Sequence, residues 1–186
     1  MGAIAINGYE LLITLALKAV ETLRLFRFQS IIMTTHPFSE YFRGFDKVEA
    51  VRRIFGEKTE QMLRDLKVEF IWGGGYMGVN SVNGHLMVSP RYLNKGDKID
   101  IYLDVIHELV HVRQFMEGKE LFDSHYSYVE RPTEVEAYRH TVEEARRLGL
   151  SDARICEYLK TEWMSRKDLE QLASTVNVQC KQGKNM

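Results

Sequence analysis

A short stretch of the chain, VIHELVH (Val105–His111), carries two histidines four residues apart and a glutamate beside the first. The residues around it, from 98 to 117, are apolar at most positions and predict one helix that is buried on nearly all sides. Burying two imidazoles and a carboxyl group without partners is costly. The fold must therefore supply partners for His107, Glu108 and His111, and this requirement constrains the chain more than any other feature.

A metal ion is the partner that this spacing suits best. On a helix that turns about 100° per residue, His107 and His111 lie about 40° apart on one face and can share a single ion. Glu108 lies beside them, close enough to take a proton from a bound water without binding the metal itself. This is the chemistry of H-E-x-x-H, two Zn²⁺ ligands and a general base. The alternative, two hydrogen-bonded core histidines and a surface glutamate, leaves the apolar surroundings of all three residues unexplained.

A catalytic zinc ion keeps three protein ligands and an open position, so a third ligand is required. The metzincin pattern would place glycine three residues after His111 and a histidine three residues further on. Gln114 and Glu117 occupy those positions, and the metzincin pattern is excluded.

The third ligand is expected in RPTEVEAY, Arg131–Tyr138, where Pro132 suits the first position of a helix. Glu134 borders the apolar stripe of this helix, whereas Glu136 shares a polar face that is expected to be solvated. We therefore predict Glu134 as the ligand. A helix that begins later would instead rotate Glu130 or Glu136 towards the metal.

Together these motifs resemble the gluzincin metallopeptidases, and in scale the short minigluzincins. The resemblance rests on His107–His111 and on the Glu-x-x-Ala of Glu134–Ala137. It implies a zincin-like fold, one Zn²⁺ ion, and hydrolysis of peptide bonds with Glu108 as the catalytic base. The chain departs from the family at Tyr138, where an aspartate often orients a zinc-binding histidine, and Asp104 is a local candidate for that role.

The resemblance also implies a sheet whose edge strand pairs with an extended peptide. Two strands, Tyr76–Val82 and His85–Ser89, flank Asn83-Gly84 and predict a hairpin with a two-residue turn. The loop between the two metal-binding helices offers three candidates to donate a hydrogen bond to the oxyanion, or else three ordinary loop residues: His125, Tyr126 and Tyr128.

The remaining pattern predicts one α+β domain over residues 1–186, with a small, mostly antiparallel sheet and further helices at both ends. A helix interrupted near Gly56 is expected over Phe45–Leu66, followed by a strand at Val68–Trp72. Towards the C-terminus we expect a helix from Pro132 to just before Gly149, one that starts at Ser151, one capped by Ser165 and Asp168, and a flexible tail over 177–186.

The N-terminal segment, residues 1–35, follows a helical period and is interrupted by charges too early to cross a membrane. We expect this helix to pack on the body of the protein; contact of Tyr9–Phe28 with a membrane surface is the less favoured alternative. No basic region precedes it and no cleavage site follows it, so a signal peptide is not expected.

The composition excludes some classes of partner. The chain has 25 basic and 26 acidic residues and a net charge of −1, without the basic excess that nucleic-acid binding requires. Cys156 and Cys180 lie far apart in no metal-binding spacing and are not expected to form a disulfide framework, which favours a reducing, cytoplasmic location.

Three functions follow from the sequence. The leading one is a zinc-dependent peptidase that acts on peptides or proteins, and that a terminal segment could keep latent. The second is a regulatory or interaction protein with a zincin fold and little hydrolysis, because a fold does not guarantee activity. The third is a protein that binds a membrane surface through its N-terminal segment.

Overall fold

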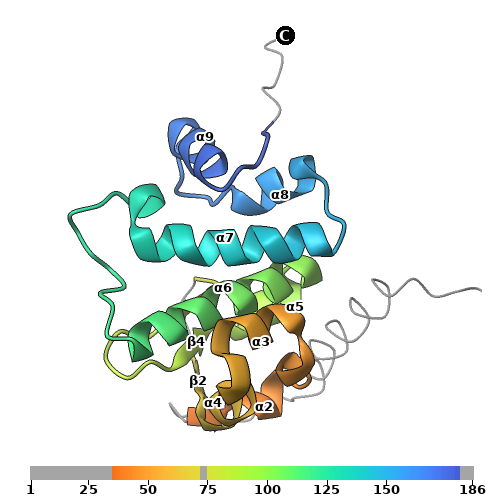
Figure 1. The fold of residues 1–186 in the computed structure, drawn as a ribbon, viewed down its shortest axis with the longest axis vertical. Helices are drawn as coiled ribbons and strands as arrows, with labels where there is room; N and C mark the ends of the chain where they lie inside the picture. Colours follow the sequence, from red (N-terminus) through yellow and green to blue (C-terminus); the bar gives the residue numbers. More distant parts are fainter. Residues whose placement is uncertain (1–34, 72–74, 181–186) are drawn as a thin grey trace, which may run out of the picture.

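Helix α6 (Lys98–Met116) packs against α7 (Pro132–Arg147) on one side and against α3 (Glu49–Phe55) and strand β3 (Met77–Val79) on others. The computed structural model describes residues 35–71 and 75–180 and shows an α+β domain (Figure 1). Its elements, in chain order, are β1 (Thr35–Pro37), α2 (Phe38–Tyr41), η2 (Phe45–Lys47), α3 (Glu49–Phe55), η3 (Gly56–Lys58), α4 (Thr59–Asp65), β2 (Lys67–Phe70), β3 (Met77–Val79), β4 (Leu86–Val88), α5 (Pro90–Lys95), α6, η4 (Tyr128–Glu130), α7 (Pro132–Arg147), α8 (Asp152–Leu159) and α9 (Arg166–Thr175).

Local hydrogen bonds define both ends of α6. The Asp97 side chain accepts hydrogen bonds from the backbone N–H groups of Ile99 and Asp100 and so caps the first turn. At the other end Gly118 adopts a φ of 74°, and the N–H of Lys119 bonds to the carbonyl of Gln114. The helix between these ends is buried along most of its length.

Helix α7 lies alongside α6, with α8 and α9 on its far side (Figure 1). Pro132 occupies its first turn, and Gly149, with a φ of 78°, follows its last. Deep between α6 and α7, the Tyr102 hydroxyl donates to the fully buried Glu144 at 2.6 Å, and Arg147 pairs with the same carboxylate. These bonds fix one end of the helix pair, and the histidines lie towards the other.

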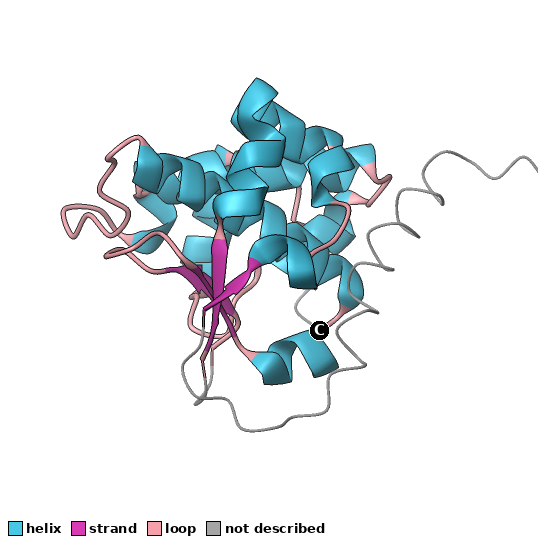
Figure 2. Ribbon diagram, turned by 90° about the horizontal axis from the view of Figure 1, so that it is seen from below, coloured by secondary structure: helices cyan, strands magenta, loops and turns pink. Residues whose placement is uncertain are grey.

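The sheet, whose strands are magenta in Figure 2, is mixed and has the strand order β1-β2-β4-β3. Antiparallel pairing joins β1 to β2 and β3 to β4, but β2 and β4 run parallel. Two of the three pairings are antiparallel, as expected for a mostly antiparallel sheet, and the parallel pairing of β2 with β4 is the departure. Strand β3 lies at one edge, with its other side free of a pairing strand among the described residues.

The predicted hairpin forms, but the predicted turn is wrong. Pairing of Met77 with Val88 and of Val79 with Leu86 continues to Asn80 and His85, which leaves a four-residue loop, 81–84. The side chains of Asn80 and Asn83 accept backbone N–H bonds inside this loop and stabilise it. These local bonds favour the longer loop over the two-residue turn.

The other helices largely follow the predictions. The interruption at Gly56, the Ser151 cap of α8 and the capping box of Ser165 and Asp168 are all present. Strand β2 covers the first part of the expected Val68–Trp72, whereas Trp72 lies outside the described residues. Four short elements of the described residues were not predicted: β1, α2, α5 and the 3-10 helix η4.

Contrary to expectation, Cys156 on α8 forms a disulfide with Cys180. Residues 177–180, assigned to the flexible tail, are also held by other contacts: Val178 is buried, and the backbone N–H of Gln179 donates to Asp152. The pairing removes the cysteine-based argument for a cytoplasmic location.

The expected N-terminal helix and the rest of the tail, 181–186, lie outside the described residues. In the part of the chain that the structure describes, no helix has the length and apolarity needed to cross a membrane.

Candidate metal centre

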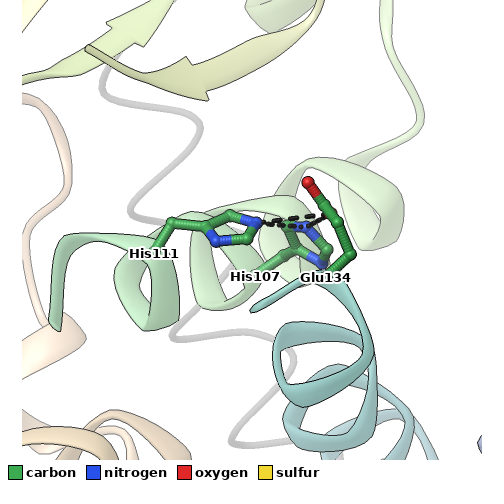
Figure 3. A group of neighbouring side chains, drawn as sticks. All are labelled: His107, His111 and Glu134. Atoms are coloured by element: carbon green, nitrogen blue, oxygen red, sulfur yellow. Dashed lines mark hydrogen bonds and ion pairs between the residues drawn. The ribbon is translucent and has the colours of Figure 1, made fainter. Parts of the chain in front are cut away.

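Three predicted ligands converge between α6 and the start of α7 (Figure 3). The Nε2 atoms of His107 and His111 lie 3.0 Å apart. One carboxylate oxygen of Glu134 lies 3.3 Å from the first and 3.4 Å from the second. All three residues are buried, and together they form a group that could hold a metal ion.

On the His111 side, the second ring nitrogen is held by a polar network. Nδ1–H of His111 donates to the side-chain oxygen of Gln114 at 2.7 Å. The amide nitrogen of Gln114 in turn donates to the Thr133 carbonyl at 3.0 Å and to Glu136 at 2.8 Å. With Nδ1 protonated, the lone pair of the neutral ring is on Nε2, which faces the other ligands.

The His107 side is different. Its Nδ1 is buried and has no hydrogen-bond partner among the described residues. The ring instead packs edge-on against Tyr138, with the centroids 4.5 Å apart. Asp104 was expected to orient a histidine here, but its carboxylate accepts from two tyrosines instead. That expectation is wrong, and packing against the Tyr138 ring holds His107 instead.

When no metal is bound, the electrostatics of the group favour an ionised Glu134 and a proton on His111. Burial opposes ionisation of Glu134, but hydrogen bonds from both histidines hold its pKa well below the usual range. Burial lowers the pKa of His107. At His111 burial also acts against the charged form, but Glu134 and Glu108 outweigh it and raise the pKa to about 9.

Glu108 is buried beside the group and lines the same cleft. Burial, more than any charge nearby, raises its pKa to about 8. A carboxyl group with this pKa can both accept and release a proton near neutral pH.

The cleft has a volume of about 1270 Å³ and runs between the edge strand β3, the metal ligands and the loop after α8. Tyr128, one of the three candidate oxyanion donors, lines it, and its hydroxyl lies 2.9 Å from that of Tyr138. His125 and Tyr126 are exposed and are not among the cleft-lining residues. Of the three candidates, the structure brings Tyr128 alone to the site.

The competing glutamates do not reach the group. Glu130 is exposed and accepts hydrogen bonds from Ser127 and Gln171. Glu136 was expected to be solvated, but it is half-buried and pairs with Arg113 and Lys119. Its face of α7 packs against the end of α6, so it belongs to the network behind His111.

Gln114 is the site residue that sequence reasoning missed. It is fully buried and links His111 to the first turn of α7. A signal was present, since a polar residue three positions after a helical histidine lies on the same face and can reach its ring.

Comparisons with protein-family models, with curated proteins and with solved structures gave no match.

Proposed function

We propose that the protein is a zinc-dependent metallopeptidase. The observation that carries the proposal is the convergence of two histidine Nε2 atoms and one Glu134 oxygen within 3.0–3.4 Å of one another. Glu108 lies on the same helix and lines the same cleft. This is the ligand and base arrangement that hydrolytic zinc sites require.

Two observations support zinc as the metal. Two imidazole nitrogens and one carboxylate oxygen are a ligand set that Zn²⁺ commonly takes in catalytic sites. Tetrahedral ligands at about 2.05 Å from such an ion lie about 3.3 Å from one another, close to the separations found here. The buried group therefore fits the ion without rearrangement of the backbone.

Bound Zn²⁺ would supply Lewis acidity, polarising the scissile carbonyl and making water more acidic. The chain's own contribution is proton transfer at the Glu108 carboxylate. Glu108 takes a proton from the attacking water and passes it to the departing amine. A cation in the site would lower the pKa of Glu108 from its metal-free value of about 8, which favours the basic form.

The substrate is proposed to be an extended peptide or protein segment. Among the described residues β3 is an edge strand, and it lines the cleft, which supports pairing of its backbone with that of a peptide. The Tyr128 hydroxyl is the candidate donor to the oxyanion, because the half-buried side chain lines the cleft and its hydroxyl is hydrogen-bonded to that of Tyr138.

The test is cleavage of a peptide library by the zinc-loaded wild type and by Glu108→Gln. The amide keeps the shape of the side chain but cannot act as a base, so we expect zinc retention and a loss of at least about 100-fold in kcat/KM. Glu143→Gln, which makes the same chemical change at an exposed position of α7 outside the cleft, is the control and is expected to cleave. Zinc binding without cleavage by the wild type would favour a regulatory protein instead. Equal cleavage by the wild type and Glu108→Gln would remove Glu108 from the mechanism.

A further inference from the structure

A second polar group lines the cleft one helical turn before Glu108. Asp104 accepts hydrogen bonds from the hydroxyls of Tyr92 at 2.5 Å and Tyr158 at 2.8 Å. Residues four apart on a helix share a face, so Asp104 and Glu108 are turned towards the same side of α6. All three members of this group, which we call the Asp104 cluster, line the cleft.

The Asp104 charge is not neutralised within the structure. Over residues 35–71 and 75–180, no lysine, arginine or histidine forms an ion pair with it, and its two partners are neutral phenols. Neighbouring Asp97 and Asp100 both pair with Arg154. Burial raises the pKa of Asp104 to about 6, and the negative charge of Asp100 acts in the same direction. An uncompensated carboxylate in a partly buried position is costly unless a ligand completes it.

The side chains around the cluster suit a cation. The ring of Tyr92 packs edge-on against Tyr76 at 4.9 Å, and Tyr76 is 6.4 Å from Trp163 between ring centroids. Tyr76 and Trp163 are exposed and line the cleft, so their rings are accessible to a ligand. Aromatic rings beside a carboxylate bind ammonium and guanidinium groups by combined cation–π and ionic attraction.

The two tyrosines leave part of the carboxylate available. An ionised carboxylate has about four acceptor positions, and Tyr92 and Tyr158 use two of them. Their hydrogen bonds also fix the orientation of Asp104, so a bound cation would meet an ordered acceptor.

We propose that the Asp104 cluster is a subsite for a cationic group of the substrate. The group is either a lysine or arginine side chain or the free N-terminal ammonium of the peptide. The proposal rests on the peptidase function proposed above and extends it by naming the substrate class. A neutral group would leave the carboxylate uncompensated, and an acidic one would be repelled.

The test measures peptide binding in the zinc-loaded Glu108→Gln protein, where cleavage does not interfere. Fluorescence anisotropy compares acetylated octapeptides that carry one lysine at each position in turn with matched norleucine peptides. The third set, after the acetylated lysine and acetylated norleucine peptides, is a norleucine peptide with a free N-terminus. We expect a cationic peptide to bind about 10- to 100-fold tighter than its neutral match, the range of a hydrogen bond to a charged group. A preference in the lysine set identifies a side-chain subsite, and one in the third set identifies the terminal ammonium.

Asp104→Asn, added to Glu108→Gln, should remove most of this preference. Asp97→Asn is the matched control, because it removes one cleft charge from the same helix while asparagine remains a good N-cap, and it should retain the preference.

If Asp104→Asn does not fold, glutamate peptides provide the second measurement, and they should bind more weakly than norleucine peptides. Equal binding of the lysine, norleucine and glutamate peptides would overturn the proposed subsite. So would a preference for cationic peptides that remains in Asp104→Asn. Cleavage by the wild type without any preference would overturn the subsite alone, and a preference in binding without cleavage would overturn the peptidase function alone.

Discussion

The two histidines of the metal centre offer the same ring atom from neighbouring turns of one helix, but the protein holds them by different means. His111 donates to Gln114, which is itself bonded to two groups of α7. Within residues 35–71 and 75–180, the Nδ1 atom of His107 has no such bond, and the ring packs against Tyr138. Hydrogen bonds fix both the tautomer and the orientation of a ring, whereas packing fixes its orientation alone. The contrast indicates that the His111 side sets the alignment of the site.

The position of Glu134 supports this view. The Gln114 amide bonds to the Thr133 carbonyl and to Glu136, the residues one before and two after the carboxylate ligand. The same side chain thus holds one histidine ligand and the helix turn that carries the glutamate ligand. Loss of this link should disturb two of the three ligands together.

The largest expected effect comes from removing the ligand that both sides share. Glu134→Ala should weaken zinc binding by a factor of at least about 100, because a three-ligand site loses one ligand. Glu136→Ala, two residues away, keeps all three ligands and should weaken binding less than about tenfold. Competition with a chelator of known affinity measures both. Normal affinity in Glu134→Ala would end the assignment of the third ligand.

The second-largest effect on zinc affinity should come from removing the hydrogen bonds of Gln114. Gln114→Leu is similar in volume and leaves the metal ligands intact, but His111 loses the acceptor at Nδ1. We expect zinc affinity to fall about 10- to 100-fold, the usual effect of losing a partner behind a histidine ligand. Competition with the same chelator measures this loss of zinc affinity. An unchanged affinity would mean that the two sides are held equally well by packing.

The pH dependence of zinc affinity distinguishes the two histidines by their protonation. The metal-free pKa is raised to about 9 at His111 and lowered at His107, so the proton of the group resides on His111. Zinc must displace that proton, and apparent affinity should therefore rise with pH, by about tenfold per unit below pH 9. Titration of Glu108→Gln removes the contribution of the Glu108 carboxyl group. A pH-independent affinity between pH 6 and 9 would place the proton elsewhere.

The smallest effect should come from the aromatic side. Tyr138→Phe keeps the ring that packs on His107 and removes only the hydroxyl bonded to Tyr128. Zinc affinity should stay within about threefold of wild type, because no ligand loses a hydrogen bond. A loss as large as that in Gln114→Leu would show that the tyrosine pair, and not packing alone, orients His107.

The sequence predicted the parts of the site that depend on local geometry. His107 and His111 meet because their spacing matches one helical turn, and Glu134 faces them because its position relative to the apolar stripe of α7 fixes its direction. The caps at Asp97, Ser151 and Ser165 were likewise predictable, since each acts within three residues.

The predictions that failed concern contacts between residues that are distant in the sequence. The Cys156–Cys180 disulfide requires α9 to fold back beside α8. The bonds of Asp104 to Tyr92 and Tyr158 join two other elements to α6. In the hairpin, the asparagine side chains shifted the loop by bonds that the Asn-Gly pattern alone does not reveal.

The most direct test of the metal centre is the zinc content of the full chain, prepared without chelator, offered the metal and freed of unbound ions. Elemental analysis should find one zinc ion per chain in the wild type and almost none in His107→Ala, His111→Ala or Glu134→Ala. A wild type without stoichiometric zinc, or the same content in wild type and all three variants, would contradict the account.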